Sequence, residues 1–226
     1  AQGYFEHGAV AFEGTKIVEV GEEAALRAKY PGAEIIDAKG GVIMPAFINA
    51  HTHIYSALAR GLSIVGNNPT NFYEVLDGTW WAIDRHLKMD GTKASATAQY
   101  MDAIKQGVTT SFDHHASYGE IPGTLHTIAE ESKRLGLRSC LCYEVSDRDG
   151  EEKCLQAIQE NADFITECEK NKDPMLAAMF GGHALFTISD KTFDRMVAAA
   201  NGRTGYHIHV SEGMRGEYDS IQAHGR

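Results

Sequence analysis

The sequence predicts an α/β fold of the (β/α)8 barrel type, and three features of the chain support this prediction. Short β-like apolar runs alternate with amphipathic helical stretches five times between residues 45 and 226, which predicts a parallel sheet with helical crossovers. Each predicted strand ends in His, Asp or Glu residues, as at the catalytic rim of a barrel. No glycine-rich phosphate-binding turn is present, so the alternative, a doubly wound sheet, is less favoured.

The composition is that of a globular protein. Hydrophobic residues make up 43% of the 226 residues, and the formal net charge is −10. This charge argues against nucleic acid or an anionic membrane as partner. No apolar run approaches the ~18 residues of a transmembrane helix. The four cysteines lack zinc-ribbon spacing, so we expect reduced thiols and a cytoplasmic location. We also expect a homo-oligomer.

Residues 1–44 predict a small region that resembles part of a β-sandwich. Apolar runs at residues 10–12 and 17–20 flank a turn with glycine and predict a hairpin. A short helix is expected at residues 22–29, followed by short strands at 34–37 and 41–44. We therefore expect a domain boundary near residue 45, with the barrel occupying residues 45–226.

The first barrel strand leads into two histidines. The apolar run Ala46–Ile48 precedes His51 and His53, which are separated by Thr52. Because strand side chains alternate between faces, both histidines lie on one face. Two imidazoles at a strand end can take two positions around one divalent metal. The alternative is a pair of polar residues where a strand leaves the core.

The rest of the chain follows the same alternation. Residues 54–89 predict a long irregular connection. Helices are then expected at 91–106, 124–135, 151–170 and 192–200, and strands at 108–112, 137–145, 175–180 and 205–210. These make five units, whereas a closed barrel takes ~250 residues. We therefore expect the C-terminal part of the barrel to be missing, in a fragment or one piece of a cut chain.

Six motifs resemble the amidohydrolase superfamily and cover nearly the whole chain: MPAFINAHTH, TWWAIDRHL, AIKQGVTTSFDHHAS, CYEVSDRDG, GGHALFTIS and YHIHVSE. The similarity is greatest to the branch that holds cytosine, guanine and adenosine-type deaminases and triazine hydrolases, and within it to the SsnA-type aminohydrolases. Pro45-Ala46 departs from the usual proline-glycine, which affects the turn and not the ligands. The resemblance implies an amidohydrolase-type barrel that hydrolyses C–N bonds other than peptide bonds. It also implies deamination of a purine-like or other nitrogen heterocycle through a metal-bound hydroxide.

The resemblance also implies roles for individual residues. His51 and His53 would be metal ligands, and His209 the third. Glu212 would be the proton shuttle, and a carboxylate near an acidified water can perform this role. His183 would contact the substrate, and because two-metal members carry a lysine there, the histidine implies one metal. We expect one Zn²⁺, with Fe²⁺ or Mn²⁺ as alternatives.

Several candidate residues keep two interpretations. Of the adjacent pair His114 and His115, His115 is the better candidate to line the substrate pocket. Trp81 could cover a planar substrate or pack in the core. His207 shares a face with His209, but core packing is favoured over ligation. Glu144 could contact substrate or form a salt bridge.

Three functions remain open at this stage. A deaminase is favoured, and a cyclic amide hydrolase or chlorohydrolase on the same scaffold is the enzyme alternative. A non-catalytic fragment is the alternative from another class. It stays open because the resemblance places a further histidine and an aspartate of the metal site beyond Arg226.

Overall fold

The computed structural model describes residues 3–225, except for the side chain of His224. The chain divides into two compact units between Ala46 and Phe47. Each unit is described by itself. No helix in the described part of the chain is both long and apolar enough to cross a membrane.

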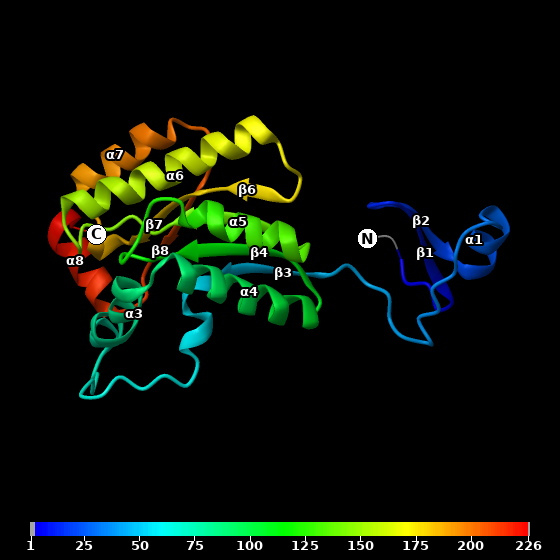
Figure 1. Ribbon diagram of the computed structural model, residues 1–226, viewed down its shortest axis with the longest axis horizontal. Helices are drawn as coiled ribbons and strands as arrows, with labels where there is room; N and C mark the ends of the chain where they lie inside the picture. Colours follow the sequence, from blue (N-terminus) through cyan, green and yellow to red (C-terminus); the bar gives the residue numbers. More distant parts are fainter. Residues whose placement is uncertain (1–2, 226) are drawn as a thin grey trace. The chain divides into compact units, whose positions relative to one another are not determined.

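The first unit is a hairpin with one helix (Figure 1). Strand β1 (Gly8–Glu13) pairs antiparallel with β2 (Lys16–Glu22), and α1 (Glu23–Lys29) follows directly. The two-residue turn holds Gly14 at φ +58°, a conformation that glycine adopts without strain. The predicted hairpin and short helix are therefore confirmed.

The two further strands predicted in this unit are wrong. Residues 34–37 and 41–44 form no strand, and the side chains of Ile36 and Val42 are 75% and 87% exposed. A strand needs a neighbour for its N–H and C=O groups, so β-forming composition alone did not suffice. The assignment of this unit to a β-sandwich stays a prediction.

The second unit is a parallel α/β structure, as predicted (Figure 1). Four strands lie in the order β3 (Phe47–Thr52), β4 (Val108–His115), β5 (Arg138–Tyr143), β6 (Leu176–Ala178). A second parallel pair consists of β7 (Phe180–Ala184) and β8 (Tyr206–His209). The main helices are α4 (Met89–Lys105), α5 (Thr124–Leu135), α6 (Glu151–Asn171), α7 (Asp190–Ala200) and α8 (Met214–His224). Strands therefore neighbour each other in chain order, as in a partial barrel.

Two predicted segments differ from the structure. Residues 54–89 contain short helical pieces where an irregular connection was expected: η1 (Ile54–Ala59), α2 (Phe72–Val75), η2 (Leu76–Trp80), α3 (Trp81–His86). The strand predicted at 175–180 is divided, because β6 pairs with β5 whereas β7 pairs with β8. Short helices without a long amphipathic period, and a change of partner inside one apolar run, leave no clear pattern in the sequence.

The core lies between the strands and the helices that connect them. Large, fully buried side chains come from α4, α5, β5 and β7, among them Tyr100, Leu125, Leu141, Tyr143 and Phe180. Burying an aliphatic side chain of this size contributes roughly 1.5–3 kcal/mol. This core fixes the carboxyl ends of the strands, where the predicted site residues lie.

A buried amide joins the two groups of strands. Asn161 of α6 accepts hydrogen bonds from the backbone N–H groups of Tyr143 (2.9 Å) and Gly181 (3.1 Å). Its Nδ2 donates to the carbonyls of Tyr143 (2.8 Å) and Ala157 (3.0 Å). A parallel bridge between Val145 and Gly182 continues the same contact. One side chain thus satisfies backbone groups of β5 and β7 that would otherwise be buried without partners.

Candidate metal centre

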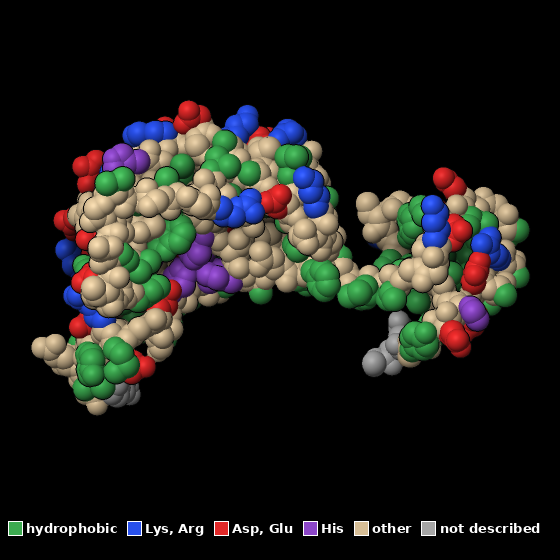
Figure 2. Space-filling model, turned by 90° about the horizontal axis from the view of Figure 1, so that it is seen from below, with side chains coloured by type: hydrophobic (Ala, Val, Ile, Leu, Met, Phe, Trp, Pro, Cys, Tyr) green, Lys and Arg blue, Asp and Glu red, His purple; other side chains and the backbone are tan. Residues whose placement is uncertain are grey.

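Histidine side chains gather on one face of the second unit (Figure 2). They come from the carboxyl ends of four strands, namely β3, β4, β7 and β8, and from the residue after β3: His51, His53, His114, His183, His207 and His209. Parallel strands carry their carboxyl ends to one edge, so residues distant in the chain meet there.

The three histidines predicted as metal ligands lie together. The ring centroids of His51 and His53 are 4.8 Å apart, and each ring lies 5.1 Å from that of His209. The Nε2 atoms of His53 and His209 are 3.2 Å apart. Two nitrogens that are each 2.0–2.1 Å from a tetrahedral ion lie about 3.3–3.4 Å apart. These two nitrogens are therefore spaced as ligands of one zinc-sized ion would be.

The opposite nitrogens of two of these rings are held by backbone carbonyls. His53 Nδ1 donates to the carbonyl oxygen of His114 (2.7 Å), and His209 Nδ1 donates to that of His183 (2.9 Å). A hydrogen bond at Nδ1 fixes the tautomer and leaves the Nε2 lone pair free for a metal. The donor set therefore fits a divalent metal of the kind that prefers imidazole.

His207 is part of the cluster through His51. Its Nε2 lies 2.9 Å from His51 Nδ1, and its ring stacks on that of His114 with centroids 4.4 Å apart. His207 is half-buried. His207 therefore packs against His114, as the sequence favoured, and also orients His51. The sequence did not predict the second contact.

His114 and Glu144 are the residues to which sequence reasoning gave no role in the metal centre. The side chain of His114 is completely buried, and within the described chain neither of its ring nitrogens has a hydrogen-bond partner. Nitrogen atoms of His51, His114 and His209 lie within 4.8 Å of one another, and so do ligand atoms of His53, His114 and Glu144. Which of two adjacent histidines faces the cluster depends on strand register, and the β3–β4 ladder shifts between Asn49 and Thr52.

His115, which the sequence favoured as a residue of the substrate pocket, is fully buried and contacts Ser117, Tyr55 and Tyr143. Its Nε2 lies 3.1 Å from Ser117 Oγ, and its ring meets those of Tyr55 and Tyr143 edge to face. Trp81 is also buried, with its ring 5.8 Å from that of His183, and it lines a cavity of about 600 Å³. Substrate contacts of His115 and Trp81 stay predictions.

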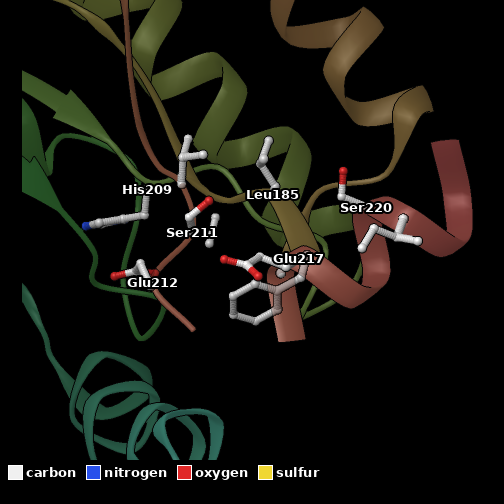
Figure 3. A pocket seen from close by; sticks show the side chains of 11 residues that line it. Leu185, His209, Ser211, Glu212, Glu217 and Ser220 are labelled. Carbon is white, nitrogen blue, oxygen red and sulfur yellow. The ribbon is translucent and has the colours of Figure 1, made fainter. Parts of the chain in front are cut away.

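Glu212 follows His209 around a strained turn into a second cavity of about 320 Å³. Ser211 between them has φ +57°, a value that residues other than glycine seldom adopt. Figure 3 shows His209, Ser211 and Glu212 in succession along one wall, with Glu217 of α8 also lining the cavity. Partial burial raises the pKa of Glu212 above its usual value, although His209 opposes this. A carboxyl with a raised pKa is suited to accepting and returning a proton.

His183 lies at the end of β7 and is 4% exposed. Its Nδ1 lies 2.8 Å from Thr187 Oγ1, and its ring is 6.2 Å from that of Phe186. Burial lowers the pKa of His183 to about 4, although Glu144 opposes the shift. A neutral imidazole that faces aromatic rings can donate or accept a hydrogen bond with a bound molecule.

The charges of the cluster are unequal. Burial alone would raise the pKa of Glu144, but the imidazoles around it, His114 first, hold this pKa well below its usual range. Burial alone would lower the pKa of His53, but Glu144 raises it to about 9. Burial and neighbouring imidazoles lower the pKa of His51 to about 4. Glu144 therefore carries the negative charge that offsets a cation or a proton in the cluster.

Comparisons with known proteins identify the family of this chain. The model of the amidohydrolase family matches residues 42–226, and an imidazolonepropionase-like composite domain of bacteria matches residues 8–33. The 5'-deoxyadenosine deaminase of Methanobrevibacter smithii is 28% identical over 218 residues, which is 96% of this chain and 47% of the relative. The 5-methylthioadenosine/S-adenosylhomocysteine deaminase of Thermococcus sibiricus is 32% identical, over 90% of this chain and 45% of the relative.

Solved structures share the fold. An adenosine deaminase of Xanthomonas campestris with bound zinc superposes with a TM-score of 0.75 at 20% identity, covering 98% of this chain and 48% of that chain. A triazine hydrolase of Arthrobacter aurescens gives 0.75 at 20% identity, covering 96% and 50%. This chain thus spans about half the length of the curated relatives and solved structures that it matches.

Proposed function

Because the chain belongs to the amidohydrolase family, we propose that the protein is a metal-dependent hydrolase of C–N bonds that deaminates a purine-like or other nitrogen heterocycle. The single observation that carries this proposal is the convergence of His51, His53 and His209, with Glu212 beside them. The relatives named as deaminases of adenosine derivatives support the substrate class.

The residues of the chain have separate tasks in this reaction. His51, His53 and His209 would hold one divalent ion, which supplies acidified water when bound. Glu212 takes a proton from the attacking water on its carboxylate and returns it to the departing amine nitrogen. His183 holds or polarises the heterocycle. Partial burial raises the pKa of the Glu212 carboxyl above its usual value, the direction that makes a carboxylate a better proton acceptor.

Finer points belong to the same proposal. Zinc is the favoured metal because the facing donors are imidazoles, with Fe²⁺ or Mn²⁺ able to take the same place. The zinc in the Xanthomonas neighbour supports this choice. We further propose that the protein is a cytoplasmic homo-oligomer and acts on a small molecule with SsnA-like specificity. Residues 45–226 would form the first five units of its barrel.

Glu212→Gln in the full-length protein tests the proposal. Glutamine has nearly the same shape but cannot carry the proton, so kcat should fall about 10²–10⁴-fold while the metal content stays unchanged. Glu217→Gln is the matched control, because Glu217 lines the same cavity and should leave turnover near the wild-type value. Ammonia release from a panel of aminopurines and aminopyrimidines is the measurement, with metal content by mass spectrometry.

Other outcomes of this assay contradict the proposal. Wild-type turnover in Glu212→Gln would exclude the proton-shuttle role. Chloride or a ring-opened product in place of ammonia would show a chlorohydrolase or a cyclic amide hydrolase. Loss of the metal in the variant would show that Glu212 is a ligand.

A further inference from the structure

A buried carboxylate lies behind the metal-facing side of the histidine cluster. The side chain of Glu144, directly after β5, is 3% exposed. Within the described chain, no Lys or Arg nitrogen lies within 4.0 Å of it, and Oε1 makes no hydrogen bond. Burying a carboxylate without a basic partner costs free energy of folding. Other groups must therefore stabilise Glu144 at this position.

Glu144 faces three imidazoles instead. Oε1 lies 3.2 Å from His53 Nδ1 and 3.8 Å from His114 Nδ1, and Oε2 lies 3.7 Å from His183 Nε2. These rings come from three different places in the fold: the end of β3, the strand β4 and the strand β7. One carboxylate therefore contacts a candidate metal ligand and the candidate substrate-contact residue at once.

The geometry at His53 indicates how Glu144 acts on this ring. His53 Nδ1 donates to the carbonyl of His114 at 2.7 Å, so this nitrogen carries a proton and cannot bind a second ion. Glu144 at 3.2 Å lies beside the same N–H. A carboxylate in this place stabilises the Nδ1–H form electrostatically and directs the free Nε2 toward His209, 3.2 Å away.

We propose that Glu144 is a positioning residue of the metal centre: it holds His53 in the Nδ1–H tautomer, so that Nε2 faces the ion, and it aligns His183 through its second oxygen. This inference rests on the proposed function only in that a metal binds at His51, His53 and His209. The residue makes no bond to the metal or the substrate.

The test measures metal affinity without substrate. The metal-free full-length protein is titrated with Co²⁺ or Zn²⁺ against a chromophoric chelator. Glu144→Gln should bind about 10–100-fold more weakly than the wild type, as for other outer partners of a metal ligand. Glu144→Asp keeps the charge on a shorter side chain and should recover part of the loss.

Glu160→Gln is the matched control for burial. Glu160 is also a buried glutamate, but it accepts from the backbone N–H groups of Gly123 (2.7 Å) and Leu125 (2.8 Å) at the start of α5. This variant should lose stability and keep its metal affinity. Equal affinity in Glu144→Gln and the wild type would overturn the proposal, and so would an equal loss in both variants.

A spectroscopic readout separates positioning from general structure. In the metal-free protein at pH 10, above the pKa of about 9 that Glu144 gives to the His53 ring, ¹⁵N shifts of this ring, assigned with His53→Gln, should show a proton on Nδ1 in the wild type and a mixture of tautomers in Glu144→Gln. Should Glu144→Gln fail to fold, Glu144→Asp gives the same two readouts. An unchanged tautomer would refute the role. A protein that binds metal in this way but releases no ammonia would contradict the proposed function and leave this inference standing.

Discussion

The three predicted metal ligands differ in the hydrogen-bond partner of their Nδ1 atoms. His53 and His209 donate to carbonyls of neighbouring strands, which the parallel sheet fixes. His51 instead meets a side chain, that of His207, at 2.9 Å. A side-chain partner has rotamer freedom that a strand carbonyl does not have. His51 is therefore the ligand whose orientation depends most on a single residue.

Replacing His207 by phenylalanine tests this dependence. The ring that stacks on His114 is kept, but the nitrogen that faces His51 is removed. We expect metal affinity to fall about 10-fold with little change in the urea midpoint. Tyr206→Phe, one residue earlier on the same strand, should change neither quantity. An unchanged affinity in His207→Phe would show that His51 is oriented by other contacts.

At the scale of single residues, the two-residue period of a strand was sufficient to place His51 and His53 together, and the end of another parallel strand brought in His209. The same period did not decide between the adjacent residues His114 and His115. Which of the two faces the cluster depends on the register between β3 and β4. For Glu144 the sequence left a substrate contact and a salt bridge equally open. Its three imidazole neighbours come from other strands, so no local pattern could reveal them.

Two adjacent glycines of β7 lie close to neighbouring elements. A Cβ at Gly181 would collide with the backbone carbonyl of Tyr143, whereas a Cβ at Gly182 would meet Met196 Cε at 2.8 Å and Ile188 Cδ1 at 3.1 Å. Backbone atoms in a sheet cannot move aside, but the ends of flexible side chains can. The two glycines thus have different reasons to be small.

These neighbouring glycines make a paired prediction. Gly181→Ala should cost about 3–4 kcal/mol of the free energy of unfolding, at the high end for a point substitution. Gly182→Ala should cost about 1–2 kcal/mol, because Met196 and Ile188 can adjust. Urea unfolding followed by circular dichroism measures both. Equal losses would mean that β7 can shift away from β5.

A carboxylate fastens the loop after β5 to the start of α7. Asp147 accepts hydrogen bonds from Thr192 Oγ1 (2.6 Å) and the Ser189 backbone N–H (2.7 Å). Burial alone would raise the pKa of Asp147, but these hydrogen bonds lower it below its usual value. A lowered pKa in the folded state means stability that is present above the unfolded pKa of about 3.9 and lost as the pH falls through the folded pKa.

Asp147→Asn should therefore be less stable than the wild type by about 1–2 kcal/mol from pH 5 to 8. As the pH falls below the unfolded pKa of about 3.9, the difference should shrink, because the unfolded wild-type chain then takes up a proton that the folded carboxylate resists. Urea midpoints at pH 7 and pH 3 are the measurement. Asp194→Asn, at an exposed position of the same helix, should have little effect at either pH. A gap that persists unchanged at pH 3 would exclude ionisation as its cause.

Long amphipathic helices were predicted to within a few residues because their period is sustained, as in α5 and α6. The short helices of residues 54–89 were not, since one turn carries no period. The strands expected at 34–37 and 41–44 failed because pairing depends on a neighbour that composition does not encode. Element prediction was thus limited by length and by partners distant in the chain.

In the second unit as a whole, two strands present apolar side chains to solvent. On β3, Phe47 and Ile48 are 57% and 64% exposed, and Tyr206 of β8 is 42% exposed. Within the described chain, β3 pairs only with β4 and β8 only with β7. Strand edges of this kind offer unpaired N–H and C=O groups and apolar surface to another chain.

A polypeptide of these 226 residues should therefore self-associate and should release no ammonia. Size-exclusion chromatography with light scattering is the measurement, over a range of protein concentrations. Ile48→Lys places a charge on the exposed edge and should shift the polypeptide toward the monomer. Val65→Lys, at a residue that is 99% exposed outside the strands, is the control. A soluble, active monomer would show that the barrel assignment is wrong.

The hydrogen bonds of the Asn161 side chain suggest an order in which β5, α6 and β7 fold during synthesis. Its partner Tyr143 lies 18 residues earlier, and Gly181 lies 20 residues later. As the nascent chain leaves the ribosome, β5 and α6 emerge before β7, and the amide can bind both backbone groups of Tyr143 while β7 is still inside the exit tunnel. The oxygen that holds the Tyr143 N–H is then already in place for the N–H of Gly181. Asn161 thus acts as a template on which a later part of the chain finds its register.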